Sequence, residues 1–128
     1  CLANKETENL INAKIFKICK PNLIIVNTAR GVIIDLNAAY EALKSKKIRA
    51  IGLDVFPDEP ADKNHPLVNA WLYEKWAKGK IIFTPHSAFY SPTGLVFLRE
   101  KALKTCIDHL QGINTANCIN IKYLKNQR

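Results

Sequence analysis

The sequence lacks two features, a Gly-rich motif and a long apolar run, and each absence excludes a class of structure. The 128 residues contain no Met and only five Gly, none of them at the spacing of a G-x-G-x-x-G motif. The phosphate-binding turn that this motif builds in dinucleotide-binding folds is therefore not encoded here. The chain also has no run of ~20 apolar residues, the length that a membrane-spanning helix needs. We expect no membrane span, and no secretion signal is visible.

The cysteines and the net charge suggest an ordinary globular protein. The four Cys, at positions 1, 19, 106 and 118, show neither a C-x-x-C pair nor a metal-like spacing with His. We therefore expect reduced thiols, a cytoplasmic location and no metal site. The net charge is +8, but the Lys residues are scattered along the sequence, mostly near expected helix ends. This favours a plain solvated surface with no nucleic-acid or membrane partner, although a modest attraction for an anionic substrate or cofactor stays open.

Apolar runs and helical segments alternate along the chain. The apolar runs predict buried strands over residues 23–26, 48–56 and 81–84. The expected helices cover about 11–19, 36–44, 66–78 and 92–111, the second of them capped by Asp35 and the last two opened by Pro. The buried face of the first helix would consist of Ile11, Ile15, Ile18 and Cys19. This alternation predicts an α/β fold with a parallel sheet.

Three residues with complementary chemistry follow the three expected strands. Arg30 lies in NTARG, Glu59 in DVFPDEP and His86 in TPHSAFYS, so all would gather at the carboxyl edge of the sheet, where such folds bind ligands. An Arg can hold a carboxylate through two parallel N–H bonds, and a His can exchange a proton near neutral pH. An acid that bonds the second ring nitrogen of the His fixes its tautomer. This set fits a hydride transfer that is coupled to a proton transfer.

Each of these residues also has a purely structural interpretation. Arg30 could pair with Asp35, Glu59 could be a solvated loop acid like Asp58, and a lone His such as His86 is more often structural. The order and spacing of the three residues together favour the catalytic interpretation.

In these three contexts the chain resembles the C-terminal part of the D-isomer-specific 2-hydroxyacid dehydrogenases. The resemblance implies that Arg30 binds the substrate carboxylate, that His86 is the general acid/base and that Glu59 supports His86. It further implies that Asp54 contacts the nicotinamide carboxamide of NAD, with a turn-forming Asp as the alternative. The implied cofactor-binding residues are Thr28, Ala29, Arg30, Asp54, His86 and Ala88, and the implied substrate pocket consists of Arg30, His86 and Phe89.

Four stretches are similar to the C-terminal-binding-protein-like subgroup of this family: CLANKETENLIN, NTARG, PHSAFYS and NCINIKYL. Phe89 stands where the animal corepressors of this subgroup carry Trp, which puts an identical substrate preference in doubt. The stretch NAWLYEKWAKGK is longer than the family's usual link. Its Trp71, Tyr73 and Trp76 recur at near-helical spacing, which favours core packing over a ligand platform.

The resemblance implies the C-terminal half of a Rossmann-type, doubly wound parallel sheet. Residues 1–90 would belong to the NAD-binding domain. Residues 91–128 would form a bridging helix and, from about Asn117, a tail that returns to a substrate domain missing from this chain. The chain would then be the last third of a longer enzyme, as a truncated product or a fragment, and inactive by itself.

The implied function is an NAD-dependent oxidoreductase that moves a hydride between NAD(H) and a small D-2-hydroxy acid or 2-oxo acid, as a homodimer when full length. The subgroup also contains NAD-sensing corepressors, so a protein-binding module of the same fold is the alternative. A fragment without activity of its own is a third alternative.

Overall fold

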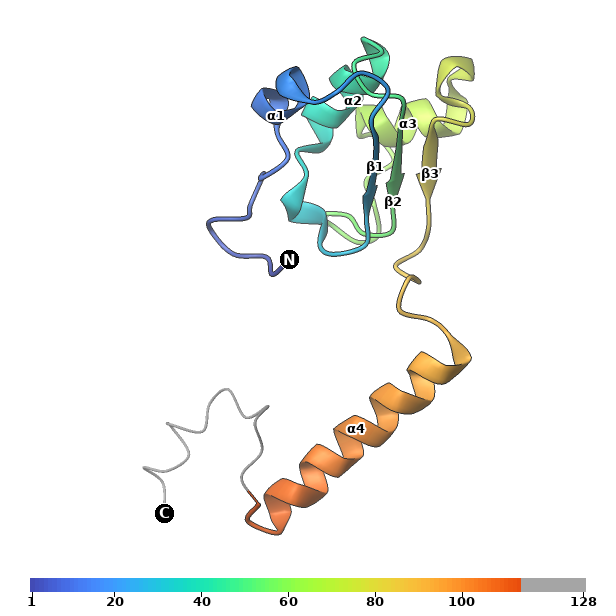
Figure 1. Ribbon diagram of the computed structural model, residues 1–128. Helices are drawn as coiled ribbons and strands as arrows, with labels where there is room; N and C mark the ends of the chain where they lie inside the picture. Colours follow the sequence, from blue (N-terminus) through green and yellow to red (C-terminus); the bar gives the residue numbers. More distant parts are fainter. Residues whose placement is uncertain (114–128) are drawn as a thin grey trace. The chain divides into compact units, whose positions relative to one another are not determined.

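The computed structural model describes residues 1–113, which fall into two compact units (Figure 1). The first unit, Cys1–Ala88, contains a three-stranded sheet with its helices, and the second unit begins at Phe89. In chain order the elements are α1 (Ala13–Ile18), β1 (Ile24–Asn27), η1 (Gly31–Ile33), α2 (Leu36–Lys44), β2 (Ala50–Leu53), α3 (Pro66–Tyr73), η2 (Lys75–Ala77), β3 (Ile81–Phe83) and α4 (Pro92–Leu110).

The sheet of the first unit is parallel, with the strand order β1-β2-β3. Ile24 pairs with Ala50 and Ile51 with Ile81, so the three strands begin at one edge of the sheet and end at the other. The helices α2 and α3 connect successive strands, and both crossovers step in the same direction, so both helices cover the same face (Figure 1). The predicted α/β fold with a parallel sheet is confirmed.

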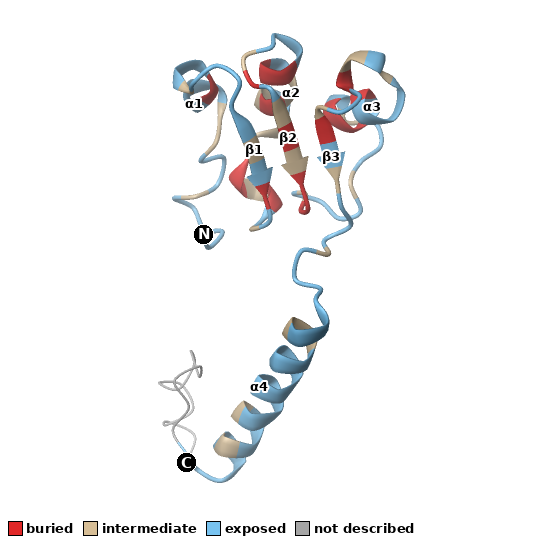
Figure 2. Cartoon of the chain, turned by 45° about the vertical axis from the view of Figure 1, so that its right-hand side comes forward, coloured by how far each residue is buried: buried red, intermediate tan, exposed pale blue. Residues whose placement is uncertain are grey.

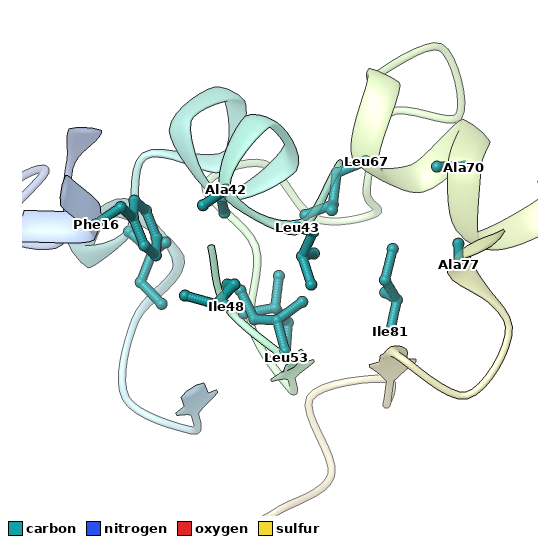
Figure 3. Close-up of a cluster of buried hydrophobic side chains, with 12 residues drawn as sticks. Phe16, Ala42, Leu43, Ile48, Leu53, Leu67, Ala70, Ala77 and Ile81 are labelled. Carbon is teal, nitrogen blue, oxygen red and sulfur yellow. The ribbon is translucent and has the colours of Figure 1, made fainter. Parts of the chain in front are cut away.

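The hydrophobic core lies between the sheet and these helices (Figure 3). Phe16 of α1, Leu43 of α2 and Leu67 of α3 are at most 3% exposed and belong to one cluster with Leu53 and Ile81 of the strands. Burial of one side chain of this size stabilises a fold by roughly 1.5–3 kcal/mol. The cluster therefore fixes the frame from which the carboxyl-edge loops project.

The predicted starts of three helices are confirmed. Asp35 and Ser91 each accept a backbone N–H bond in the first turn of α2 and α4, as N-capping side chains do. Pro66 is the first residue of α3. His65, which the sequence indicates only as a loop residue, caps α3 by accepting the Leu67 N–H at Nδ1.

Two predictions about helices are wrong. α3 ends at Tyr73 rather than near Lys78, because Glu74 has an extended backbone (ψ 124°) and the short 3₁₀ helix η2 follows. The buried residue of α1 is Phe16, whereas Ile18 of the predicted apolar stripe is 80% exposed. α1 is only six residues long, so a single large side chain is enough to anchor it.

Several residues of the three strands are exposed (Figure 2), and those that point away from the helices are apolar. Ile24, Val26 and Ile82 point away from the helices and are 54%, 69% and 63% exposed. Gly52 lies between Val26 and Ile82 in the strand register, so the apolar row crosses all three strands. Parallel sheets are normally covered on both faces. In the first unit the described residues cover the face that carries the helices and leave the opposite face open.

The second unit contains α4, in which no described residue is buried. The first unit ends at Ala88, two residues before the predicted domain boundary, and the assignment of the two parts to cofactor and substrate domains stays a prediction. The predicted tail from Asn117 lies outside the described residues. Within residues 1–113, no helix combines the length and the apolar character needed to cross a membrane.

Candidate active site

The carboxyl ends of the three strands meet at one edge of the sheet. The Asp54 N–H donates to the Asn27 carbonyl oxygen at 3.0 Å, and the Thr84 N–H donates to the Leu53 carbonyl oxygen at 3.0 Å. These bonds continue the strand pairing by one residue. The loops that follow the three strands therefore leave from the same edge of the sheet (Figure 1). The loops carry Arg30, Glu59 and His86, so the predicted site residues of the first unit share one end of the sheet.

The loop after β1 is folded by a buried amide. The side chain of Asn27, 6% exposed, accepts the Ala29 N–H at 3.0 Å and donates to the Arg30 carbonyl oxygen at 2.9 Å. Arg30 itself is exposed, and its guanidinium Nη1 donates to the Ala29 carbonyl oxygen at 2.6 Å. The alternative partner Asp35 caps α2 instead. The loop backbone is thus fixed, while the Arg30 side chain lies along its own loop.

Gly31 joins this loop to the next one. A Cβ atom built on Gly31 would lie 1.9 Å from the carbonyl carbon of Phe56 and 2.2 Å from the nitrogen of Pro57. No side chain fits at that distance, so the two backbones pack directly against each other. The residue after Arg30 therefore touches the segment that leads to Glu59.

Asp54 holds the loop after β3. Its buried carboxylate accepts the Ser87 N–H at 2.8 Å through Oδ1 and the Ala88 N–H at 2.9 Å through Oδ2, and the Thr84 hydroxyl also donates to Oδ1. The His86 N–H donates to the Asp54 carbonyl oxygen at 2.9 Å. The turn-forming role, which was the alternative for Asp54, is therefore present in the structure.

His86 and Glu59 form a side-chain pair across two loops. His86 Nδ1 lies 2.8 Å from Glu59 Oε2, and the second carboxylate oxygen of Glu59 accepts the Phe56 N–H at 3.0 Å. The side chains are 44% and 39% exposed, so the pair faces solvent on one side. His86 adopts a left-handed backbone conformation with φ 52°, which non-glycine residues rarely do.

Hydrogen bonds lower the pKa values of both carboxylates. The pKa of Asp54 is lowered chiefly by the bond from Thr84, with burial acting against this and the Ala88 and Ser87 N–H groups adding to it. The pKa of Glu59 is lowered chiefly by its bond with His86 and then by the Phe56 N–H. Glu59 is therefore ionised at neutral pH. An ionised carboxylate only accepts hydrogen bonds, so Nδ1 of His86 carries the proton between them.

The pair lines a cavity of about 450 Å³, a volume within the range of small-molecule pockets. Its apolar wall includes Phe56 and Phe83, whose rings meet edge to face at 4.9 Å, and Trp71, whose ring lies 4.9 Å from that of Phe83. Arg30 lies outside the described lining of this cavity, on the neighbouring loop. The structure thus brings Glu59 and His86 into contact, whereas the guanidinium of Arg30 bonds the Ala29 carbonyl oxygen of its own loop.

The residues present fit the nicotinamide end of a dinucleotide better than its phosphates. Oδ1 of Asp54 accepts two bonds and Oδ2 accepts one, which leaves one of about four acceptor positions for a carboxamide N–H. Thr28, Ala29 and Ala88 lie at the same sheet edge. The five Gly do not form a phosphate-binding turn. Residues 1–113 contain no cluster of His, Cys, Asp or Glu that could hold a metal ion.

Phe89, the remaining predicted pocket residue, belongs to the second unit. Its ring meets that of Tyr90 edge to face at 6.5 Å. Its place in the substrate pocket stays a prediction.

Sequence reasoning missed the residues that support the loops. Asn27 and Thr84 both directly follow or end an apolar run, where a short polar side chain can bond a neighbouring backbone group, and this signal could have identified them. The contact of Gly31 with Phe56 joins residues far apart in sequence and leaves no local signal.

Comparison with known proteins identifies the family of the chain. Residues 1–88 match the family model described as D-isomer specific 2-hydroxyacid dehydrogenase, NAD binding domain. A D-lactate dehydrogenase of Treponema pallidum is 36% identical over 115 residues, which cover 86% of this chain and 35% of that protein. A glyoxylate/hydroxypyruvate reductase B of Cronobacter sakazakii is 32% identical over 120 residues, or 94% of this chain and 35% of that protein.

Solved structures give the same result. The crystal structure of the Treponema pallidum D-lactate dehydrogenase matches with a TM-score of 0.73 at 34% identity, over 89% of this chain and 36% of that chain. The D-lactate dehydrogenase of Aquifex aeolicus, in complex with NAD and lactic acid, matches with a TM-score of 0.72 at 30% identity, over 86% of this chain and 35% of that chain. The chain spans about a third of the length of these relatives. The part of the family's fold that this chain contains is the C-terminal half of the Rossmann-type NAD-binding domain and the segment that follows it. The chain belongs to the D-isomer-specific 2-hydroxyacid dehydrogenase family.

Proposed function

We propose that this chain carries the acid/base and carboxylate-binding part of an NAD-dependent oxidoreductase that interconverts a small 2-oxo acid and a D-2-hydroxy acid. The observation that supports this most is the 2.8 Å contact between His86 Nδ1 and Glu59 Oε2, at the carboxyl edge of a sheet whose next loop carries Arg30. Acid/base chemistry needs a His whose tautomer is fixed, and the ionised Glu59 fixes it here.

The chain's own residues would handle the proton and the substrate carboxylate. NAD(H), when bound, supplies or accepts the hydride at the substrate's C2. In the reductive direction the other ring nitrogen of His86, Nε2, donates a proton to the carbonyl oxygen as that oxygen gains negative charge. Glu59 keeps the proton on Nδ1 and stabilises the charged imidazolium before the transfer. His86 then regains its proton from solvent.

Arg30 would bind the substrate carboxylate. Its planar guanidinium can form two parallel N–H bonds to a carboxylate, which orients the neighbouring carbonyl carbon as well as binding it. In the structure one guanidinium nitrogen donates to the Ala29 carbonyl oxygen. Binding of the substrate would replace this bond to its own loop, which stays fixed by Asn27.

The finer assignments are proposals of the same kind. The names of the relatives support D-lactate, glyoxylate and hydroxypyruvate as the class of substrate. The placement of Phe89 in the substrate pocket rests on the sequence resemblance alone. Thr28, Ala29, Asp54 and Ala88 would contact the nicotinamide side of NAD. A homodimer, a cytoplasmic location, membership of the C-terminal-binding-protein-like subgroup and the corepressor-like alternative stay predictions.

Turnover of a His86→Ala variant of the full-length protein tests this proposal. With NADH and either pyruvate or glyoxylate, we expect kcat to fall by about 10²–10⁴-fold, the usual contribution of a general acid/base. His109→Ala, which removes an exposed His of α4, is the control and should keep kcat. Near-normal kcat in His86→Ala would exclude His86 as the acid/base.

A further inference from the structure

The net charge of the chain is concentrated in three short segments, 17–23, 44–49 and 74–80, which we call the basic end. They contain nine Lys or Arg residues and one acidic residue, Glu74. The whole chain has 19 Lys and Arg and 11 Asp and Glu, so these 20 residues carry its entire net charge of +8. The rest of the chain is balanced. The lysines are scattered along the sequence, but they are not scattered in the fold.

Parallel pairing brings the three segments together, because each leads into one of the strands. The Arg49 N–H donates to the Leu23 carbonyl oxygen at 2.8 Å, and the Ile51 N–H donates to the Lys80 carbonyl oxygen at 2.8 Å. The strands begin side by side at the amino edge of the sheet, opposite the edge that carries His86 (Figure 1). The three segments of the basic end therefore meet at the amino edge of the sheet, whereas Glu59 and His86 lie in loops at the carboxyl edge.

Most of the cations of the basic end are available to a partner. Two already contact an aromatic side chain: Lys44 Nζ donates to the Tyr40 hydroxyl at 3.0 Å, and Lys80 Nζ lies 5.9 Å from the centroid of the Trp76 ring. Seven of the nine are exposed, and Lys47 and Lys80 are half-buried. Among residues 1–113 the ion pairs are His86 with Glu59 and Lys104 with Asp108, so none of the nine has an acidic partner at salt-bridge distance.

Helix dipoles do not account for so much charge. The C-termini of α1, α2 and α3 lie at this edge, and each contributes roughly half a negative charge. Three helices therefore offset about 1.5 of the eight positive charges. Most of the excess has no counterpart in the described part of the chain.

An aromatic groove opens beside segment 74–80 of the basic end and shares Trp71 with the wall of the active-site cavity. It has a volume of about 370 Å³, and its lining includes Trp71, Tyr73, Glu74, Lys75 and Lys78. The Glu74 carboxylate accepts the indole N–H of Trp76. Tyr73 is 74% exposed and Trp71 is 43% exposed, so two rings and two ammonium groups share one solvent-facing site. The sequence predicts that these rings pack in the core. For Tyr73 this prediction is wrong, because its side chain is exposed.

We propose that the basic end binds single-stranded nucleic acid, with phosphates on the lysines and a base stacked on Tyr73. Grooves that combine backbone-neutralising cations with exposed aromatic rings bind single strands, because every base has a face that can stack. An acidic protein segment would pair with the cations, but it has no base to stack on the ring of Tyr73. This inference replaces the expectation of no nucleic-acid partner, which rested on the scattering of Lys along the sequence.

Fluorescence anisotropy with fluorescein-labelled U20 and dT20 tests the proposal on the 128-residue chain. We expect micromolar binding at 50 mM salt that weakens steeply as salt increases. The double variant Lys75→Glu/Lys78→Glu should weaken binding at least tenfold and lower the slope of log K against log salt by about 0.7 for each phosphate that is no longer neutralised. Lys5→Glu/Lys101→Glu makes the same change in net charge outside the basic end and should weaken binding less than threefold. The two probes show whether the strand is RNA or DNA.

Tyr73 variants separate stacking from charge. Tyr73→Ala should weaken binding by roughly fivefold or more, the usual effect of removing one stacking ring, and Tyr73→Phe should bind like the unaltered chain. Equal weakening by both Lys double variants would overturn the proposal, as would a 20-base-pair duplex that binds as tightly as the single strands. Binding to phosphatidylserine-containing vesicles without binding to either oligonucleotide would assign the surface to membranes instead.

Discussion

His86 has a strained backbone conformation that neighbouring hydrogen bonds stabilise. Its left-handed backbone, with φ 52°, costs on the order of 1–3 kcal/mol for a non-glycine residue. The turn around it is held by the buried carboxylate of Asp54, which accepts bonds from Thr84, Ser87 and Ala88. The strained conformation aims the imidazole at Glu59. Asp54 therefore supports the Glu59–His86 pair indirectly, by fixing the backbone around His86.

Arg30→Lys should damage substrate recognition in the full-length protein. An ammonium group cannot form the two parallel bonds of a guanidinium, so we expect KM for the 2-oxo acid to increase by at least tenfold, with a smaller change in kcat. Steady-state kinetics measure both, and KM for NADH is the internal control. An unchanged KM for the 2-oxo acid would show that Arg30 does not bind the carboxylate.

The lowered pKa of Asp54 makes stability depend on pH. A carboxylate whose pKa is lower in the folded state stabilises the fold above its unfolded pKa, and this stabilisation is lost as pH falls through the folded value. Asp54→Asn should therefore lower the free energy of unfolding at pH 7 and reduce its decline as pH falls below about 5. Urea unfolding at several pH values measures this. Asp58→Asn, the same change at an exposed loop acid, should leave the decline unaltered.

The contact between Glu59 and His86 could be predicted from the sequence because it depends on residue type and on position after a strand. Glu59 and His86 do meet, and Asp35 caps α2 rather than pairing with Arg30. The orientation of Arg30 could not be predicted, since it depends on whether substrate or its own loop accepts its N–H groups.

At the scale of elements, helix starts were predictable and helix ends were not. Asp35, Pro66 and Ser91 are local signals, so the starts of α2, α3 and α4 follow from the sequence. No Gly or Pro marks the end of α3, which depends on packing of Trp76 and Ala77 of η2 against the core. Gly79, the expected stop, lies six residues beyond Tyr73.

Gly31→Ala tests the contact between the loops after β1 and β2. The added methyl would overlap the Phe56 carbonyl carbon at 1.9 Å, so the loops must separate. We expect a loss of about 1–3 kcal/mol or more in the free energy of unfolding. Gly52→Ala is the matched control, because its Cβ would lie at an ordinary 3.7 Å from Val26, and it should change stability by less than about 1 kcal/mol. Equal effects in urea unfolding would show that the Gly31 contact does not hold the loops together.

At the scale of the whole molecule, the 128 residues should self-associate and bind NADH weakly. The apolar row of Ile24, Val26 and Ile82 is exposed, and β1 has a partner on only one side in the described sheet. The sequence also contains no Gly-rich phosphate turn. Val26→Lys should reduce self-association in light scattering, and calorimetric titration should detect no micromolar NADH binding. A monomer that binds NADH at micromolar concentration would contradict both expectations.

The central claim is that Glu59 acts through His86, and a double-mutant cycle in the full-length protein tests it most directly. The kcat values of Glu59→Gln, His86→Ala and the double variant are compared with NADH and a 2-oxo acid. Because the two side chains form one hydrogen-bonded unit, we expect Glu59→Gln to lower kcat in the unaltered enzyme and to change it by less than about threefold once His86 is absent. An equal loss in both backgrounds would show that the two residues act independently and would contradict the proposed acid/base pair.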